Sequence, residues 1–215
     1  MTTTLVILSG GQDSTTALFW AKKRWDIVEA ITFDYGQRHK IEIASAKKVA
    51  EIAGVPHKIV KVTALEQLAD NAMINNEEIV INKITGLPTT FVPGRNLIFV
   101  TLAAGYAYGK GIKDLILGVS QVDYSGYPDC RRETITSLEN TISLGMDTEF
   151  KIHTPLIDID KKGTVLMAKE LGVLDVMKYT HTCYKGQQPP CGECPACKLR
   201  AKGFSEAGIN DPILK

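Results

Sequence analysis

Apolar and β-branched runs alternate with longer stretches of helical periodicity along the first 120 residues. Residues 5–8 form a wholly apolar run, and residues 27–33, 58–62 and 114–119 are mainly apolar runs interrupted by single polar residues. Short apolar runs bounded by turn signals are typical of buried strands. Residues 13–24, 41–53 and 96–110 have the spacing of helices, and Gly54 ends the second of them. The alternation predicts βαβ units and therefore an α/β, doubly wound parallel sheet.

The remainder of the chain has a weaker pattern. Residues 64–88 mix Asn, Glu and isolated apolar residues and predict one short helix at most. A polar loop is expected at 120–130, then a helix at 131–144, an extended segment at 150–157 and a helix at 163–171. The last forty residues are rich in Cys, Pro and Gly and cannot close over a hydrophobic core unaided. The chain therefore divides into a larger domain, residues 1–178, and a small C-terminal extension, residues 179–215.

Composition narrows the class of protein. With 44% hydrophobic and 23% charged residues, the chain has ordinary globular composition rather than that of a disordered or membrane-spanning protein. The longest mostly apolar stretch, residues 97–108, is twelve residues long. A membrane-spanning helix needs about 20. The N-terminus lacks a basic region and a cleavage site, so we expect a cytoplasmic protein without a membrane partner.

The charges are balanced along the chain. Residues 1–100 carry eleven Lys and Arg against ten Asp and Glu, and the remainder carries fourteen against fourteen. A protein that neutralises the phosphates of long nucleic acid usually has a strongly positive face. The balance therefore favours a small-molecule substrate over a nucleic acid.

The hexapeptide SGGQDS at residues 9–14 is the first candidate site. It directly follows the first predicted strand and opens the first predicted helix. Glycines let backbone N–H groups approach a ligand, hydroxyls add donors, and a helix N-terminus attracts negative charge. The segment has neither the Gly-Lys-Ser/Thr of a Walker loop nor the glycine spacing of the dinucleotide fingerprint. It predicts a phosphate-binding loop, and the simpler alternative is a Gly-Gly turn with Asp13 or Ser14 capping the helix.

Four of the five cysteines lie close together near the C-terminus. Cys191, Cys194 and Cys197 have C-x2-C-x2-C spacing, and Cys183 lies eight residues upstream. Four thiolates are the number that a closed structural zinc site takes, and such a site stabilises a segment that has no core. An iron–sulfur cluster and disulfides are the alternatives, the latter disfavoured in a chain without a secretion signal. His181 could replace one thiolate, but we interpret it as a solvated loop residue.

Several motifs together resemble one family of enzymes. The hexapeptide resembles the SGGxDS signature of the PP-loop ATP pyrophosphatases. Within that superfamily, the 7-cyano-7-deazaguanine synthase family of the queuosine pathway is similar at residues 33–39 (FDYGQRH), 91–96 (FVPGRN) and 123–131 (DYSGYPDCR), and in the cysteine array. The similarity extends from about residue 5 to about residue 205 and is weakest at 64–88.

The resemblance implies a fold and a reaction. The fold would be adenine nucleotide alpha hydrolase-like, with residues 1–178 as the PP-loop nucleotide-binding catalytic domain and residues 179–215 as the zinc-binding segment. The implied enzyme is an ATP-dependent ligase that converts 7-carboxy-7-deazaguanine and ammonia to 7-cyano-7-deazaguanine. It would adenylate first the carboxylate and then the amide. ATP with Mg²⁺, one structural Zn²⁺ per chain and a homodimer belong to the same expectation.

The resemblance also implies which residues hold the nucleotide. Loops of this class bind the β- and γ-phosphates, and cleavage is expected between the α- and β-phosphates. We expect Asp13, Ser14 and Arg95 to be catalytic, with Asp13 also a candidate for Mg²⁺. Arg95 begins a predicted helix and suits planar oxygens, although an exposed arginine on a turn is the alternative. The set expected around ATP is Leu8, Ser9, Gly10, Gly11, Gln12, Asp13, Ser14, Thr15 and Thr16.

Residues 123–131 are the candidate substrate site, because ligands gather at strand ends in open α/β sheets. A guanine-like edge offers N–H donors that a carboxylate accepts, and its ring stacks on tyrosine. Arg131 would meet the substrate carboxylate, whereas an ordinary polar turn is the alternative for the whole loop. Cys130 is expected to be a small buried side chain without a covalent role. The candidate substrate-binding residues are Asp123, Tyr124, Tyr127, Asp129 and Arg131.

Two other functions remain open on sequence grounds. A PP-loop tRNA thiolase would also carry clustered cysteines, although the balanced charge argues against it. A zinc-stabilised nucleotide-binding module without catalysis would share the loop and the cysteines, but it would not consume ATP.

Overall fold

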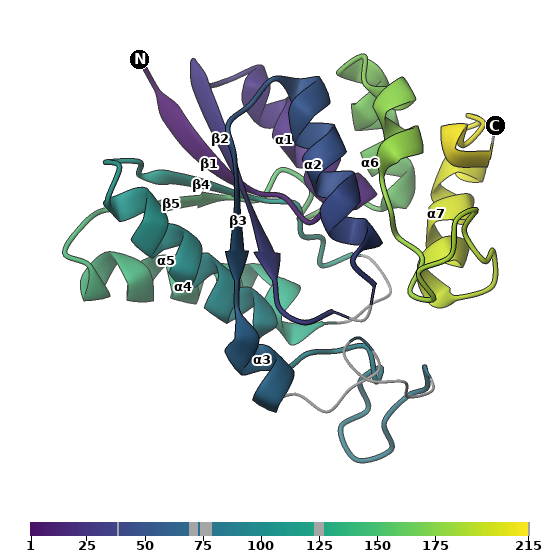
Figure 1. The fold of residues 1–215 in the computed structure, drawn as a ribbon, viewed down its shortest axis with the longest axis horizontal. Helices are drawn as coiled ribbons and strands as arrows, with labels where there is room; N and C mark the ends of the chain where they lie inside the picture. The colour runs from purple at the N-terminus through teal and green to yellow at the C-terminus, as the bar shows by residue number, and fades with distance from the viewer. Residues whose placement is uncertain (38, 69–72, 74–78, 123–126, 215) are drawn as a thin grey trace.

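A five-stranded parallel sheet forms the centre of the protein (Figure 1). The computed structural model describes residues 1–37, 39–68, 73, 79–122 and 127–214. The strands are β1 (Thr3–Ile7), β2 (Ile27–Asp34), β3 (His57–Lys61), β4 (Asp114–Leu117) and β5 (Lys151–His153), in the order β3-β2-β1-β4-β5. The predicted doubly wound parallel sheet is therefore confirmed. From β1 the chain adds β2 and β3 on one side and then β4 and β5 on the other, so the strand order reverses between β1 and β4. Ligands bind at this switch point in such sheets.

Helices cover both faces of the sheet (Figure 1). On one face, α1 (Gln12–Lys22) and α2 (Ile41–Ala53) pack on Val6 and Leu8 of the first strand segment. On the other, α3 (Thr63–Leu68), α4 (Arg95–Tyr108) and α5 (Arg132–Gly145) pack in the cluster that contains Leu5. Successive side chains of a strand point to opposite faces, so one apolar run supplies both cores. No described helix is both long and apolar enough to span a membrane.

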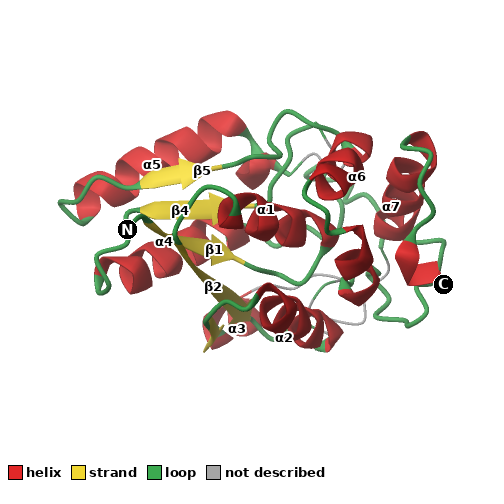
Figure 2. Cartoon of the chain, turned by 90° about the horizontal axis from the view of Figure 1, so that it is seen from above, coloured by secondary structure: helices red, strands yellow, loops and turns green. Residues whose placement is uncertain are grey.

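A third group of helices lies beyond the carboxyl ends of the strands (Figure 2). It consists of α6 (Lys161–Glu170), η2 (Leu174–Tyr179), α7 (Pro195–Glu206) and η3 (Pro212–Leu214). Phe204 of α7 packs with Val165 and Met177 in a small core of its own. The sequence pattern did not predict α7, which begins with Pro195 in its first turn. Its buried face consists of Cys197, Arg200, Gly203 and Phe204, so only one of the buried residues is a large apolar one.

Arg200 fastens the C-terminal segment to the rest of the molecule. Its guanidinium donates two hydrogen bonds to Asp211, at 2.6 and 2.8 Å, and a third to the Thr180 hydroxyl at 2.7 Å. Arg200 is 3% exposed, so these bonds satisfy a buried charge. Arg200 also donates to the Met177 carbonyl oxygen at 3.0 Å, so the network crosses the predicted division at residue 178, which stays a prediction.

Candidate active site

The SGGQDS segment forms a closed loop between β1 and α1. Gly10 has a φ of +86°, and a Cβ there would lie 2.3 Å from the carbonyl oxygen of Glu42, so only glycine fits. The Ser14 hydroxyl lies 3.0 Å from the Ser9 hydroxyl and donates to the Gly11 carbonyl oxygen at 3.2 Å. Ser14 thus holds the loop in shape. The first N–H groups of a helix have no partner within the helix, so the geometry of this loop is compatible with the predicted phosphate-binding role, which stays a prediction.

Gly118 lets β4 approach this loop closely. A Cβ on Gly118 would lie 2.7 Å from both the backbone nitrogen and the Cα atom of Ser14. Backbone atoms cannot rotate away as a flexible side chain can. The close approach therefore sets the position of the phosphate loop against the neighbouring strand.

Replacing Gly118 with Ala is expected to displace the loop. The added methyl group overlaps the Ser14 backbone, and the shift that removes the overlap lowers stability by about 1–3 kcal/mol. The displaced loop is expected to raise the KM for ATP. Thermal unfolding and steady-state kinetics measure both effects. Gly105→Ala is the matched control, because nothing lies within 4 Å of a Cβ at that position in α4. An unchanged melting temperature and KM in Gly118→Ala would show that the loop position does not depend on this contact.

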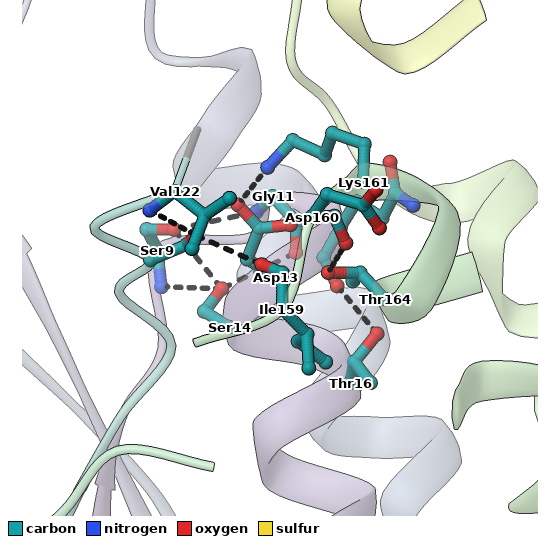
Figure 3. Close-up of polar contacts among 12 residues, drawn as sticks. Ser9, Gly11, Asp13, Ser14, Thr16, Val122, Ile159, Asp160, Lys161 and Thr164 are labelled. Carbon is teal, nitrogen blue, oxygen red and sulfur yellow. Dashed lines mark hydrogen bonds and ion pairs between the residues drawn. The ribbon is translucent and has the colours of Figure 1, made fainter. Parts of the chain in front are cut away.

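Lys161 faces the phosphate loop from the first turn of α6 (Figure 3). Its Nζ lies 2.5 Å from Oδ2 of Asp13, with the two side chains 12% and 29% exposed. The Asp13 Oδ1 atom is buried without a hydrogen-bond partner among the described residues, so it can accept a cation. Lys161 was not predicted as a site residue. Its place after β5, at the carboxyl end of a parallel strand, is the signal that would have found it.

A cavity of about 300 Å³ opens beside the loop at the carboxyl ends of β1, β2 and β4. Gln12 lies against it with a buried amide that has no partner among the residues described. Gly10, Thr15 and Thr16 do not line the cavity, and Thr16 donates instead to the Gln12 carbonyl oxygen at 2.9 Å. The residues expected around ATP that do line it are Leu8, Ser9, Gly11, Gln12, Asp13 and Ser14.

Arg95 lines the same cavity from the N-terminus of α4. The preceding Gly94 adopts a left-handed conformation, with φ of +73°, that turns the chain into the helix. One guanidinium nitrogen donates to the Tyr35 hydroxyl at 3.4 Å. Burial raises the pKa of the nearby Glu42 carboxyl to about 7, and Arg95 only partly opposes the rise. The sequence predicted Arg95 and did not point to Glu42, whereas Tyr35 lies in the 33–39 motif of the resemblance without an assigned role.

The predicted substrate loop is placed in part. Asp123 and Tyr124 lie outside the described residues. Tyr127 lines the cavity, and its hydroxyl lies 2.6 Å from that of Thr90. Asp129 is 5% exposed and accepts a hydrogen bond from the backbone nitrogen of Asn96 at 3.2 Å, at the start of α4. Arg131 is exposed and does not line the cavity. The roles assigned to these residues stay predictions.

Cys130 is buried in the wall of the cavity. Its Sγ accepts a hydrogen bond from the Asn96 side chain at 3.3 Å. Burial raises the pKa of the thiol to about 12, and neighbouring Asp129 adds to the effect. A thiol with this pKa stays protonated near neutral pH, and the lack of a covalent role for Cys130 stays a prediction.

The four predicted metal ligands come together. The Sγ atoms of Cys183, Cys191, Cys194 and Cys197 all lie within 4.8 Å of one another, and those of Cys191 and Cys197 are 3.8 Å apart. In a tetrahedral site with Zn–S bonds of about 2.3 Å, the sulfur atoms are about 3.8 Å apart. The geometry and the donor set therefore fit a closed zinc site.

His181 connects the metal-binding segment to the phosphate loop. Its backbone nitrogen donates to the Gly10 carbonyl oxygen at 2.9 Å, and its ring lies 3.0 Å from the Cys183 carbonyl oxygen. The interpretation of His181 as a solvated residue is wrong, because the side chain is only 4% exposed. Tyr184, next to Cys183, lines the cavity. The metal-binding segment thus forms one wall of the site.

The comparisons agree with this geometry. The family model described as "Queuosine biosynthesis protein QueC" matches residues 3–208. The chain belongs to the QueC family. A protein of Laribacter hongkongensis named 7-cyano-7-deazaguanine synthase is 50% identical over 98% of this chain and 93% of its own length. A Chromobacterium violaceum protein of the same name is 49% identical over 98% and 92%. The resemblance drawn from the motifs is therefore confirmed.

Solved structures show how widely the QueC fold is shared. A 4-thiouridine synthetase in a complex with RNA and bound ATP has a TM-score of 0.56 and 21% identity, covering 99% of this chain and 51% of that one. At this identity the likeness concerns the fold alone. The substrate of this QueC protein must be argued from its own site.

Proposed function

We propose that this QueC protein is an ATP-dependent ligase that converts 7-carboxy-7-deazaguanine and ammonia to 7-cyano-7-deazaguanine. The observation that carries the proposal is the closed SGGQDS loop with Lys161 facing Asp13 in a cavity that also contains Arg95. Half of all positions are identical to the Laribacter synthase over nearly the full length. The site holds charged groups for the nucleotide and for a second anionic reactant.

Adenylation makes the carboxylate reactive. A carboxylate oxygen of the substrate attacks the α-phosphorus of ATP, and pyrophosphate leaves with the electron pair of the broken P–O bond. The loop N–H groups and Lys161 stabilise the charge that collects on the departing pyrophosphate. Arg95 suits the planar oxygens of the carboxylate or the α-phosphate. Positioning and electrostatics thus carry most of the catalysis.

Ammonia then displaces AMP to give an amide, and a second ATP activates the amide oxygen in the same way. Loss of that oxygen with AMP, and of protons from nitrogen, leaves the nitrile. Both steps need the same arrangement of nucleotide and acyl carbon, so one cavity serves both. No covalent attachment to the protein is required, in keeping with the protonated thiol of Cys130.

Two metal ions fit the residues present. Asp13, with its unpartnered Oδ1, would hold the Mg²⁺ that accompanies ATP, and this ion would offset phosphate charge. The four-cysteine cluster would hold one Zn²⁺ with a structural role, since a site with four thiolates has no open position for substrate. The chain's own residues bind and orient the reactants. Metal analysis of the purified protein distinguishes zinc from an iron–sulfur cluster.

The proposal includes a cytoplasmic homodimer whose partners are small molecules rather than nucleic acid or a membrane. The balanced charge of the chain favours a small-molecule enzyme over a tRNA thiolase, because a protein that binds tRNA needs an excess of positive charge to neutralise the phosphates. In a binding assay at low salt, we expect no salt-dependent affinity for tRNA. Sedimentation analysis measures the oligomeric state.

Turnover with defined reactants tests the proposal. The metal-loaded protein is mixed with ATP, Mg²⁺, ammonium and 7-carboxy-7-deazaguanine, and mass spectrometry follows amide, nitrile and nucleotide products. We expect the nitrile and AMP. Absence of any ATP-dependent product would contradict the ligase and favour the thiolase, whereas ATP binding without consumption would favour the non-catalytic module.

A further inference from the structure

The cavity contains a second pair of opposite charges, away from Lys161 and Asp13. Glu42, in the first turn of α2, and Arg95, at the start of α4, both line it. The Glu42 carboxylate is half-buried and has no hydrogen bond or ion pair with the part of the chain that the structure describes. Within the described structure, the Arg95 guanidinium has one hydrogen bond, to the Tyr35 hydroxyl at 3.4 Å. Partly buried charges with so few partners are costly unless a ligand completes them.

The fold places Glu42 beside the SGGQDS loop. Its carbonyl oxygen is the atom that a Cβ on Gly10 would strike at 2.3 Å, so the first turn of α2 lies directly against the phosphate loop. In the strand order β3-β2-β1-β4-β5, α2 follows β2, whereas α6 with Lys161 follows β5. Glu42 and Lys161 therefore flank the loop from opposite sides. We therefore assign the side of the loop with the Lys161 cation to the pyrophosphate, and the side with Glu42 and Arg95 to the acyl group.

The groups facing Glu42 come from several elements. Arg95 lies on α4, Tyr35 follows β2, and Tyr184 follows Cys183, and all three line the cavity together with Glu42. Burial raises the pKa of Tyr35 and Tyr184, so both hydroxyls stay neutral. Among the described residues that act on the Glu42 carboxyl, Arg95 is the cation. It acts against the burial that raises the pKa of Glu42 to about 7.

We propose that Glu42 binds the ammonium ion and accepts the proton that it must lose before it attacks the acyl adenylate. This inference rests on the proposed function. The two reactants that meet after adenylation bind to side chains of opposite charge. Arg95 attracts the acyl or phosphate oxygens, and Glu42 attracts the cationic nitrogen of ammonium. A carboxylate and a guanidinium across one cavity therefore bring nitrogen to carbon.

The proton balance is the same in both halves of the reaction. Ammonium gives one proton to Glu42, its freed electron pair forms the C–N bond, and the C–O bond breaks with AMP keeping the pair. The second N–H proton follows after Glu42 has passed the first to solvent. In the second half, adenylation of the amide oxygen leaves a nitrogen with two protons; one passes through Glu42 to solvent, and Glu42 takes the other as C≡N forms and AMP leaves with the C–O electron pair. A base with a pKa near the working pH can both accept a proton from nitrogen and release it to solvent.

A neutral guanine-like edge is the rival occupant. A carboxylate accepts two adjacent N–H donors well, so Glu42 could read the purine-like ring instead. That role would use Glu42 before adenylation, in binding the carboxylate substrate. The ammonium role uses it only afterwards. The two are separable because adenylation can be followed on its own, as exchange of pyrophosphate into ATP.

Glu42→Gln in the metal-loaded enzyme is the decisive variant. We expect kcat/KM for ammonium to fall about 100-fold or more, the usual contribution of a general base. The KM for 7-carboxy-7-deazaguanine and the carboxylate-dependent exchange of pyrophosphate into ATP should stay within about twofold, because adenylation does not use the proton acceptor. Hydroxylamine, largely unprotonated at neutral pH, should narrow the deficit to about tenfold or less.

Two further variants complete the design. Glu42→Asp keeps the carboxylate and should recover part of the lost rate, and the rise in activity through about pH 7 should vanish only in Glu42→Gln. Glu51→Gln on the same helix is the control, since that carboxylate is 70% exposed and paired only with Lys48 in the described structure. All its parameters should match those of the parent.

Three results would overturn the inference. A raised KM for the carboxylate substrate with an unchanged KM for ammonium would assign Glu42 to the ring. Unchanged kinetics would leave it without a role. Parental enzyme that shows neither exchange nor nitrile would refute the proposed function, and the inference would fall with it.

Discussion

Lys161→Met is expected to lower kcat for nitrile formation by about 100- to 1,000-fold. Lys161 is the cation that faces the phosphate loop in the described site, with its Nζ 2.5 Å from Asp13. Removing one preoriented donor to developing charge typically costs this much. The substitution slows the adenylation step itself, so the rate of exchange of pyrophosphate into ATP should fall by a similar factor. Steady-state kinetics and the exchange assay measure the two.

The neighbouring residue provides the control. Lys162 is exposed on the same turn of α6, and Lys162→Met should leave kcat within about twofold. The Lys161 Cβ packs closely against Gly203 of α7, since a Cβ built on Gly203 would lie only 2.6 Å from it. Met has the same Cβ, so the contact between α6 and α7 is retained. A double variant, Lys161→Met with Asp13→Asn, removes both charges. If it recovered the parental rate, Lys161 would serve only to neutralise Asp13.

Cys194→Ser is expected to release the metal and to destabilise the protein strongly. The four Sγ atoms lie within 4.8 Å of one another and hold a segment with little apolar core. A loss of about 4 kcal/mol, near the upper end for one substitution, lowers Tm by about 8–16 °C for a chain of this size. Differential scanning calorimetry with metal analysis tests both effects. Cys130→Ala, outside the cluster, should retain the metal and lose far less stability.

The same substitution should weaken ATP binding. His181 donates its backbone N–H to Gly10 at 2.9 Å, and its ring contacts the Cys183 carbonyl oxygen, so disorder of the metal loop removes a support of the phosphate loop. We expect the KM for ATP to rise about tenfold below the unfolding temperature of the variant. Parental stability and ATP affinity in metal-free protein would show that the metal has another role.

Much of the fold followed from local patterns. The predicted helix at 41–53 matches α2 residue for residue, because Gly54 is in the left-handed conformation that ends a helix. The extended segment at 150–157 contains only the three residues of β5, and the chain then turns toward α6. An edge strand has one partner and therefore ends where that pairing ends.

The sequence by itself determined the parallel sheet, the phosphate loop and the four-cysteine set, because each depends on residues that are close in the chain. Only the tertiary structure decided the rest of the site. Lys161 meets Asp13 across 148 positions, and Glu42 faces Arg95 from another helix. His181 is buried because its backbone pairs with Gly10. Such contacts depend on how strands are ordered and how helices pack, which no local spacing of residues records.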